Sequence, residues 1–111
     1  MLQYEIAKKL YEEIEEKAAK CSKEGFGEFY RSFLEDATEY AKTRMAWSFM
    51  EQDERAENDR GRSAKHDAFM AMLQAICRNL GIEEIDEIMP DRKTKGDFAC
   101  YVALFLALEQ R

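Results

Sequence analysis

The hydrophobic positions of the chain recur at helical spacing. Between residues 2 and 22 they follow one another every three or four residues, at Leu2, Ile6, Leu10, Ile14, Ala18 and Cys21. A stripe of this kind buries one side of a helix and leaves the intervening glutamates and lysines in water. The glycines at 25 and 27 are then expected to end the helix.

A second helix is predicted from about Glu28, with a broad aromatic side. Its apolar positions are Phe29, Tyr30, Phe33, Leu34, Ala37, Tyr40, Ala41, Met45, Trp47, Phe49 and Met50. If it runs unbroken to Arg55 it is about 42 Å long at 1.5 Å per residue, so its last turns should project. Residues 51–67 hold no apolar side chain larger than alanine, and residues 58–61 (Asn-Asp-Arg-Gly) favour a turn. We therefore expect a polar helical hairpin tip there, in part disordered.

A third helix is expected to begin near Ser63, a good N-cap residue, and to reach Leu80. Gly81 followed by Ile82 is typical of a helix that ends in a left-handed residue. Isoleucines at 82, 85 and 88 predict one short helical turn, which Pro90 ends. Residues 92–96 are interpreted as a basic loop, and Asp97 as the cap of a last helix that runs to about Glu109.

Residues 98–108 of this last helix are apolar on every side. Such a helix must be surrounded by its own domain or by another chain. The predicted fold is therefore all-α, a bundle of four main helices with a short extra helical turn before the last one, in a single domain of residues 1–111. The predicted core is Ile6, Leu10, Ile14, Phe33, Leu34, Ala41, Phe69, Leu73, Ile76, Val102, Phe105 and Leu106.

The composition excludes some classes of function. A formal net charge of −6 argues against binding to a nucleic-acid backbone. The longest apolar run, 11 residues, is too short to span a bilayer, so no membrane association is expected. Three cysteines without metal-ligand spacing, and no signal peptide, indicate reduced thiols in a cytoplasmic protein. No metal or cofactor is expected.

Two segments carry residues with possible chemistry. In residues 62–69 the only histidine, His66, stands beside Asp67, where it could act as acid, base or ligand, or be an incidental surface residue. In residues 92–101 three cations precede a predicted helix start and could hold an anion, or could form a solvated loop. Cys100 follows them, and a catalytic Cys–His pair would require it or Cys77 to meet His66. No oxyanion hole is recognisable, so the sequence does not indicate an enzyme.

These two segments, Arg62-x-x-Lys65-His66-Asp67-Ala68-Phe69 and Arg92-Lys93-x-Lys95-Gly96-Asp97-Phe98-Ala99-Cys100-Tyr101, resemble a family of short helical bacterial proteins. Members of that family are uncharacterised, mostly Gram-positive and often encoded in mobile elements. The similarity covers residues 55–111. It implies no activity or ligand, but it suggests that the two segments form one unit.

Two hypotheses of function follow. The first is a non-enzymatic protein-interaction or regulatory module that binds an unknown protein partner or forms a homodimer, in part through the small residues Ala99, Ala103 and Ala107. The alternative is a domain that binds a small molecule or anion at the starts of the last two helices. The residues of that polar patch would be Arg62, His66, Asp67, Arg92, Lys95 and Asp97.

Overall fold

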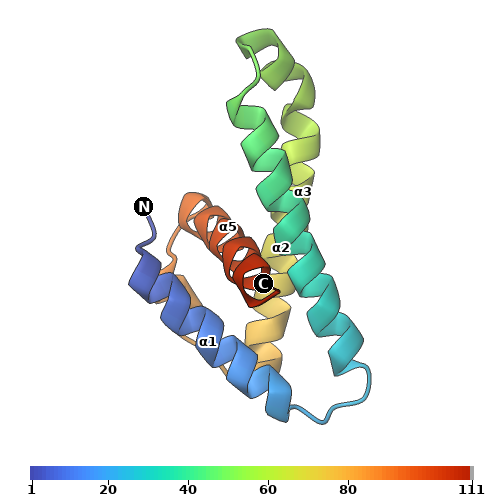
Figure 1. Ribbon diagram of the computed structural model, residues 1–111, viewed down its shortest axis with the longest axis vertical. Coiled ribbons are helices and arrows are strands. Elements are labelled where there is room, and N and C mark those ends of the chain that lie inside the picture. Colours follow the sequence, from blue (N-terminus) through green and yellow to red (C-terminus); the bar gives the residue numbers. More distant parts are fainter. Residues whose placement is uncertain (111) are drawn as a thin grey trace.

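The computed structural model describes residues 1–110 and confirms an all-α bundle of four main helices with one short extra helix. Arg111, the last residue of the predicted domain, lies outside the described residues. The elements are α1 (Tyr4–Lys20), α2 (Phe26–Ser48), α3 (Gln52–Leu80), α4 (Ile85–Ile88) and α5 (Arg92–Glu109). In Figure 1, α2 and α3 form a long hairpin that extends beyond α1 and α5.

α1 buries a slightly different side from the one its spacing predicts. Leu10 and Ile14 are buried as expected, but Ile6 is 42% exposed, so its place in the predicted core was wrong. Ala7 and Tyr11 are buried in its place. The Tyr11 ring packs 5.1 Å from that of Phe105, and this larger aromatic contact decides the rotation of the helix.

The turn between α2 and α3 lies at residues 49–51, about ten residues before the predicted one. α2 ends at Ser48, and α3 runs for 29 residues through the expected turn and past Ser63, which caps nothing. The Arg55 side chain explains the early turn, because it donates to the carbonyl oxygens of Trp47 (3.1 Å) and Ser48 (3.1 Å). It therefore satisfies the last carbonyls of α2. The predicted polar tip is thus continuous helix.

The connection from α3 to α5 is partly as predicted. Gly81 adopts φ 73° and the N–H of Ile82 donates to the Cys77 oxygen over 2.9 Å, which confirms the left-handed helix end. The short helix α4 is also confirmed. The final helix, however, begins at Arg92, because the Asp91 carboxylate accepts from the Thr94 N–H over 2.8 Å. The predicted basic loop at residues 92–96 and the predicted capping role of Asp97 were therefore wrong.

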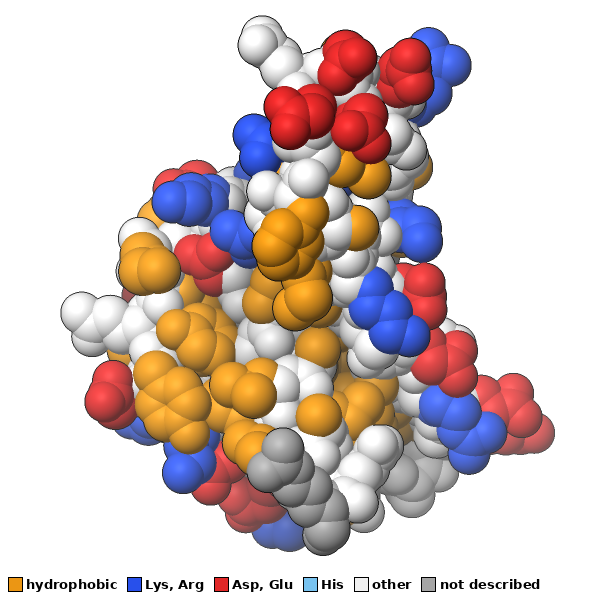
Figure 2. All heavy atoms as spheres, turned by 45° about the horizontal axis from the view of Figure 1, so that its top comes forward, with side chains coloured by type: hydrophobic (Ala, Val, Ile, Leu, Met, Phe, Trp, Pro, Cys, Tyr) orange, Lys and Arg blue, Asp and Glu red, His pale blue; other side chains and the backbone are white. Residues whose placement is uncertain are grey.

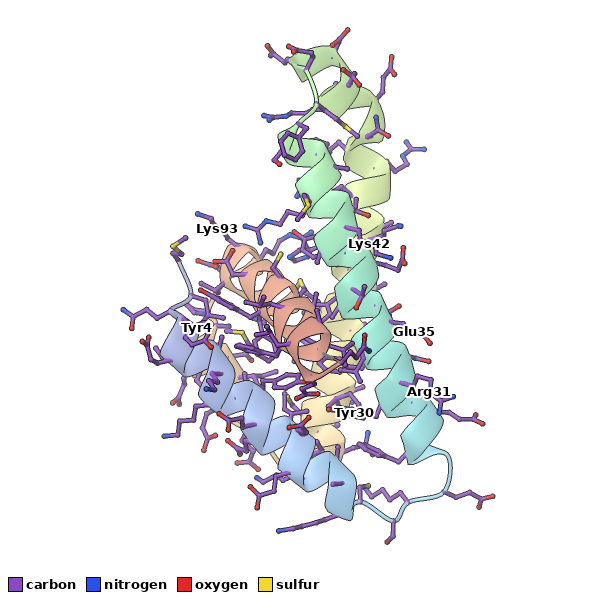
Figure 3. All side chains as sticks on the ribbon, viewed as in Figure 1. Tyr4, Tyr30, Arg31, Glu35, Lys42 and Lys93 are labelled. Atoms are coloured by element: carbon purple, nitrogen blue, oxygen red, sulfur yellow. The ribbon has the colours of Figure 1, made fainter. Side chains whose placement is uncertain are left out.

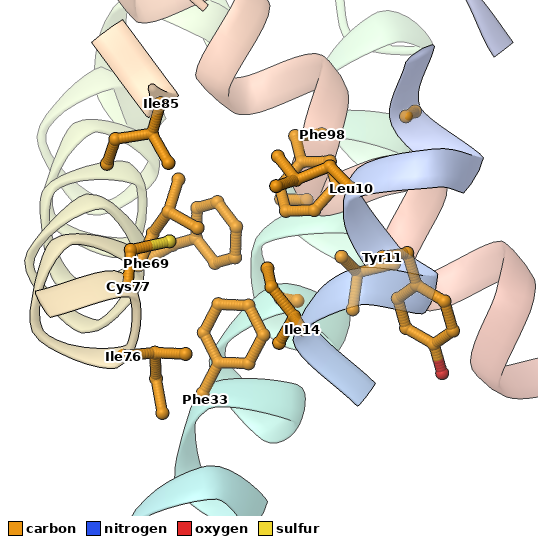
Figure 4. Close-up of a cluster of buried hydrophobic side chains, with 14 of the residues drawn as sticks. Leu10, Tyr11, Ile14, Phe33, Phe69, Ile76, Cys77, Ile85 and Phe98 are labelled. Atoms are coloured by element: carbon orange, nitrogen blue, oxygen red, sulfur yellow. The ribbon is translucent and has the colours of Figure 1, made fainter. Parts of the chain in front are cut away.

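The core lies where α5 crosses between α1, α2 and α3. Phe33, Phe69 and Phe98 are fully buried there (Figure 4). α5 nevertheless has only three neighbouring long helices, so its own domain does not surround it completely: Leu104 and Leu108 are 44% and 46% exposed. Of the other predicted core positions, Leu34, Ala41 and Leu106 are only half-buried.

α5 runs parallel to α1 and antiparallel to α2. Its second and third turns contact the start of α1, where the Tyr101 hydroxyl donates to the Leu2 oxygen over 3.1 Å, and its end contacts Tyr11. The same second turn meets the end of α2 through an ion pair between Asp97 and Arg44. We call residues 45–65, which extend beyond this level, the arm; Figure 1 shows it projecting from the body of the bundle.

Candidate functional site

Three of the six predicted patch residues come together at what we call the polar junction: His66, Asp67 and Arg92. Nε2 of His66 lies 2.7 Å from the Arg92 carbonyl oxygen, so this nitrogen carries the proton and donates. The Arg92 guanidinium pairs with the Asp67 carboxylate over 2.8 Å. The start of α5 therefore meets α3, but at the middle of α3 and not at its start, since α3 begins at Gln52. The expected pair of adjacent helix N-termini was wrong.

His66 is enclosed at this junction. Its side chain stands edge-on to the Tyr40 ring, with ring centroids 5.1 Å apart, and the residue is 4% exposed. Gly96 permits this packing, because a Cβ there would lie 3.3 Å from the imidazole and 3.0 Å from the Tyr40 hydroxyl. Burial lowers the pKa of His66, so the ring is neutral at pH 7. Nε2 is occupied by its hydrogen bond to Arg92, and Nδ1 is buried without a hydrogen-bond partner. The ring therefore holds α3 and α5 together, and neither nitrogen is accessible to a substrate from solvent.

The other two cations of the predicted patch lie away from the junction. The Arg62 guanidinium stacks 4.5 Å from the Trp47 ring centroid within the arm and also pairs with Asp59. Lys95 is buried, and its Nζ donates to the Met89 oxygen over 2.8 Å, which fixes the loop before α5. A partner carboxylate, Asp86, lies 3.2 Å from this Nζ. Because each cation of the predicted patch has its own carboxylate, the arrangement does not favour an added anion.

Asp97 lies on another side of α5 and joins three segments. One carboxylate oxygen accepts from the Arg44 guanidinium over 2.7 Å, and the other accepts from the Leu2 N–H over 3.2 Å. The residue is buried, and removing either charge would leave the other one poorly solvated. Asp97 is therefore a structural link between α2, α5 and the first residues of the chain.

A hollow of about 270 Å³ opens beside this link, and sequence reasoning missed it. It is lined by Met1, Leu2, Arg44, Asp97, Cys100, Tyr101 and Leu104. The Arg44 guanidinium lies 3.8 Å from the Cys100 sulfur, yet burial raises the pKa of this thiol above its usual value. The thiol is thus protonated at pH 7. Since Cys100 contacts Arg44 while His66 contacts Arg92, the two do not form a catalytic pair.

Around the hollow, large hydrophobic side chains are exposed on one side of the molecule. Figure 2 shows them gathered over the arm, α5 and the start of α1. We call this surface the apolar face; its exposed residues are Met1, Tyr4, Met45, Phe49, Leu104 and Leu108, and the half-buried Cys100 lies in the hollow beside them. Phe49 is 84% exposed and Met45 66%. Exposure of this extent on contiguous hydrophobic side chains is typical of an interaction surface.

A carboxyl cluster lies at the far end of α5, against α1. The Tyr11 hydroxyl donates to the Glu109 carboxylate over 3.1 Å. A hydrogen bond to Glu109, followed by burial, raises the pKa of Glu15 to about 6. Sequence analysis did not indicate this pair because its members are 94 positions apart in the chain. Among residues 1–110 no group of three or more potential ligands is placed to hold a metal ion.

Comparisons with known proteins identify no relative. No protein-family model matches the chain, and neither a search of curated protein sequences nor one of solved structures finds a similar protein. Within the described part of the chain, no helix combines the length and the hydropathy needed to cross a membrane.

Proposed function

We propose that this protein is a non-enzymatic interaction module that binds a protein partner through the apolar face. The observation that carries the proposal is the open side of α5. Residues 98–108 contain no charged side chain, and Leu104 and Leu108 remain nearly half exposed after the bundle has formed. Burying such side chains against a partner is favourable by about 25 cal/mol per Å² of apolar surface.

The state of the reactive groups supports a non-enzymatic role. The single imidazole is enclosed between α3 and α5, and the Cys100 thiol is protonated beside Arg44. Cys77 is buried, which raises the pKa of its thiol to about 12. None of these groups offers the poised nucleophile or base that catalysis needs.

The cysteines also support a proposal for the compartment. Cys21, Cys77 and Cys100 are all free thiols. Free thiols persist in reducing compartments, so we place the working protein in the cytoplasm.

Photo-crosslinking in cells tests the interaction module. A photoreactive phenylalanine analogue at position 104 is expected to give a defined protein adduct. The same analogue at Gln74, which is exposed on α3 outside the apolar face, serves as the control and should give none. Absence of an adduct at 104, or equal labelling at both positions, would contradict the proposal. The adduct mass also reports whether the partner is this chain or another protein.

A further inference from the structure

We propose that the partner of the apolar face is a second copy of this chain, related by a two-fold axis that passes near Arg44 and Cys100. The inference rests on the proposed function and deepens it by naming the partner and the register. It is carried by the register of α2 against α5, by the hollow between them, and by the charge and size of the face.

The register makes the face self-complementary. Arg44 on α2 contacts Asp97 and Cys100 on α5, and the two helices are antiparallel. At 1.5 Å per residue, Phe49 lies about 7 Å beyond Arg44 along α2, and Leu104 lies about 6 Å beyond Cys100 in the opposite direction. A two-fold axis that lies in the plane of the face at the level of Arg44 and Cys100, oblique to both helices, places Phe49 of each copy over Leu104 of the other. Such reciprocal contact is the defining property of a two-fold interface.

The hollow gives the projecting side chains of the arm a place to dock. Its volume is about 270 Å³, and Leu2, Cys100, Tyr101 and Leu104 supply most of its wall. A cavity of about 150 Å³ already admits a benzene ring. The hollow therefore has room for one side chain of the size of Met45 or Phe49, both of which are exposed on the arm.

The centre of the proposed contact is free of unpaired acidic side chains, although each copy has a net charge of −6. No acidic residue lies in α5 between Asp97 and Glu109, and Asp97 is already neutralised by Arg44. The exposed acidic residues of the arm lie beyond Phe49, at Glu51, Asp53, Glu54, Glu57 and Asp59. Like charges are thus kept away from the centre of the contact, where they would oppose association most strongly.

The size of the face explains why the arm must take part. An 18-residue helix is about 27 Å long and about 10 Å wide, so the open side of α5 alone covers roughly 270 Å². A stable interface buries about 800 Å² on each partner. The start of α1, shown by Tyr4 beside α5 in Figure 3, and the projecting arm supply the remaining surface. A smaller partner, such as a single helix, would leave Phe49 uncovered.

Sedimentation of the purified chain tests the self-association. We expect a concentration-dependent dimer of twice 13.0 kDa. Leu104→Glu should raise the dimer dissociation constant about 100-fold or more, because each copy would then bury an unpaired charge. Ile6→Glu is the matched control, since Ile6 is equally exposed but lies outside the face, and it should leave the constant unchanged. A monomer at all concentrations, or equal effects of the two variants, would overturn the inference.

A short bismaleimide crosslinker tests the register. In a Cys21→Ser background, Cys100 of one copy should crosslink to Cys100 of the second copy, because both thiols lie next to the two-fold axis. In a Cys21→Ser, Cys100→Ser background, a mixture of Phe49→Cys and Leu104→Cys chains should crosslink to each other far more than either does to itself. Equal or preferential self-crosslinking of Phe49→Cys would overturn the register. If the chain is monomeric while position 104 still crosslinks to a different protein in cells, the interaction module stands and the second copy is excluded.

Discussion

The two halves of α5 differ in which side chains they bury. In its first half the charged side chains of Lys95 and Asp97 are buried, each with hydrogen-bond partners from another part of the chain. In its second half the hydrophobic side chains of Leu104 and Leu108 are nearly half exposed. The contrast teaches that polarity alone does not decide burial in this helix: two charged side chains are enclosed with partners, while two leucines remain exposed.

Asp97→Ala should produce a large loss of stability, although it removes only a polar contact. It removes the partner of Arg44 and of the Leu2 N–H, so we expect the free energy of unfolding to fall by about 3 kcal/mol. Urea denaturation measures the change. As a control, Glu13→Ala breaks an exposed pair with Lys17 and should cost no more than about 0.5 kcal/mol. If both substitutions cost the same, Asp97 does not hold the fold.

Alanine substitutions at two glycines within helices should change the stability of the protein in opposite directions. Gly96→Ala is expected to destabilise the protein by about 1–2 kcal/mol, because its Cβ meets Tyr40 and His66 in the packed junction. Gly61→Ala in the arm should stabilise by about 0.5–1 kcal/mol, since nothing lies within 4 Å of its added Cβ and alanine favours helix. Thermal unfolding compares the two variants. A stabilising Gly96→Ala would show that α5 does not pack tightly on α3.

At the far end of α5, Glu15→Gln should give a stability difference that depends on pH. The folded state raises the pKa of Glu15 from 4.5 to about 6, so folding favours the protonated carboxyl. Its contribution to stability is therefore present below pH 4.5 and is lost as the pH rises to 6 and above. Glutamine resembles the protonated form, so Glu15→Gln should be more stable than the parent at pH 8 and similar at pH 4.5. Denaturation at both pH values, with exposed Glu83→Gln as control, measures this; a difference that is the same at both would contradict it.

Leu104→Ala should have the smallest effect on the fold. Because the side chain is already 44% exposed, we expect the unfolding free energy of the isolated chain to change by less than about 1 kcal/mol. Phe98→Ala, from the buried half of the same helix, should cost about 3–5 kcal/mol. Denaturation at a concentration too low for association measures both. A large loss with Leu104→Ala would place this residue in the core instead of on the face.

The helices could be predicted because their evidence is local. The stripe of α1, the aromatic side of α2 and the glycine end of α3 each lie within one segment of sequence. The predicted starts of α3 and α5 were wrong because residues 58–61 are of types common in turns and Asp97 is of a type common at helix caps. The Arg55 contacts and the Asp91–Thr94 cap prevail over these local preferences.

The site was less predictable, since it depends on how helices are rotated against one another. The sequence brought together His66, Asp67 and Arg92, and the structure confirms that these three meet. The position of Asp97 could not be predicted from the sequence. Because α5 begins at Arg92, before the predicted start, Asp97 lies inside the helix and its side chain pairs with Arg44 on α2. The exposure of one side of α5 could not be predicted for a related reason: an apolar sequence does not show how many neighbouring helices will pack against it.

The parallel packing of α1 on α5 has a consequence for the order in which the chain folds during synthesis. The rings of Tyr4 and Tyr11 both pack on Phe105, about a hundred residues later. The α2–α3 hairpin, by contrast, closes across residues 49–51 as soon as α3 has been made. Contacts between distant residues form late, so during synthesis α1 must wait without its partner until α5 has been made. The synthesis of α5 thus decides when α1 becomes native.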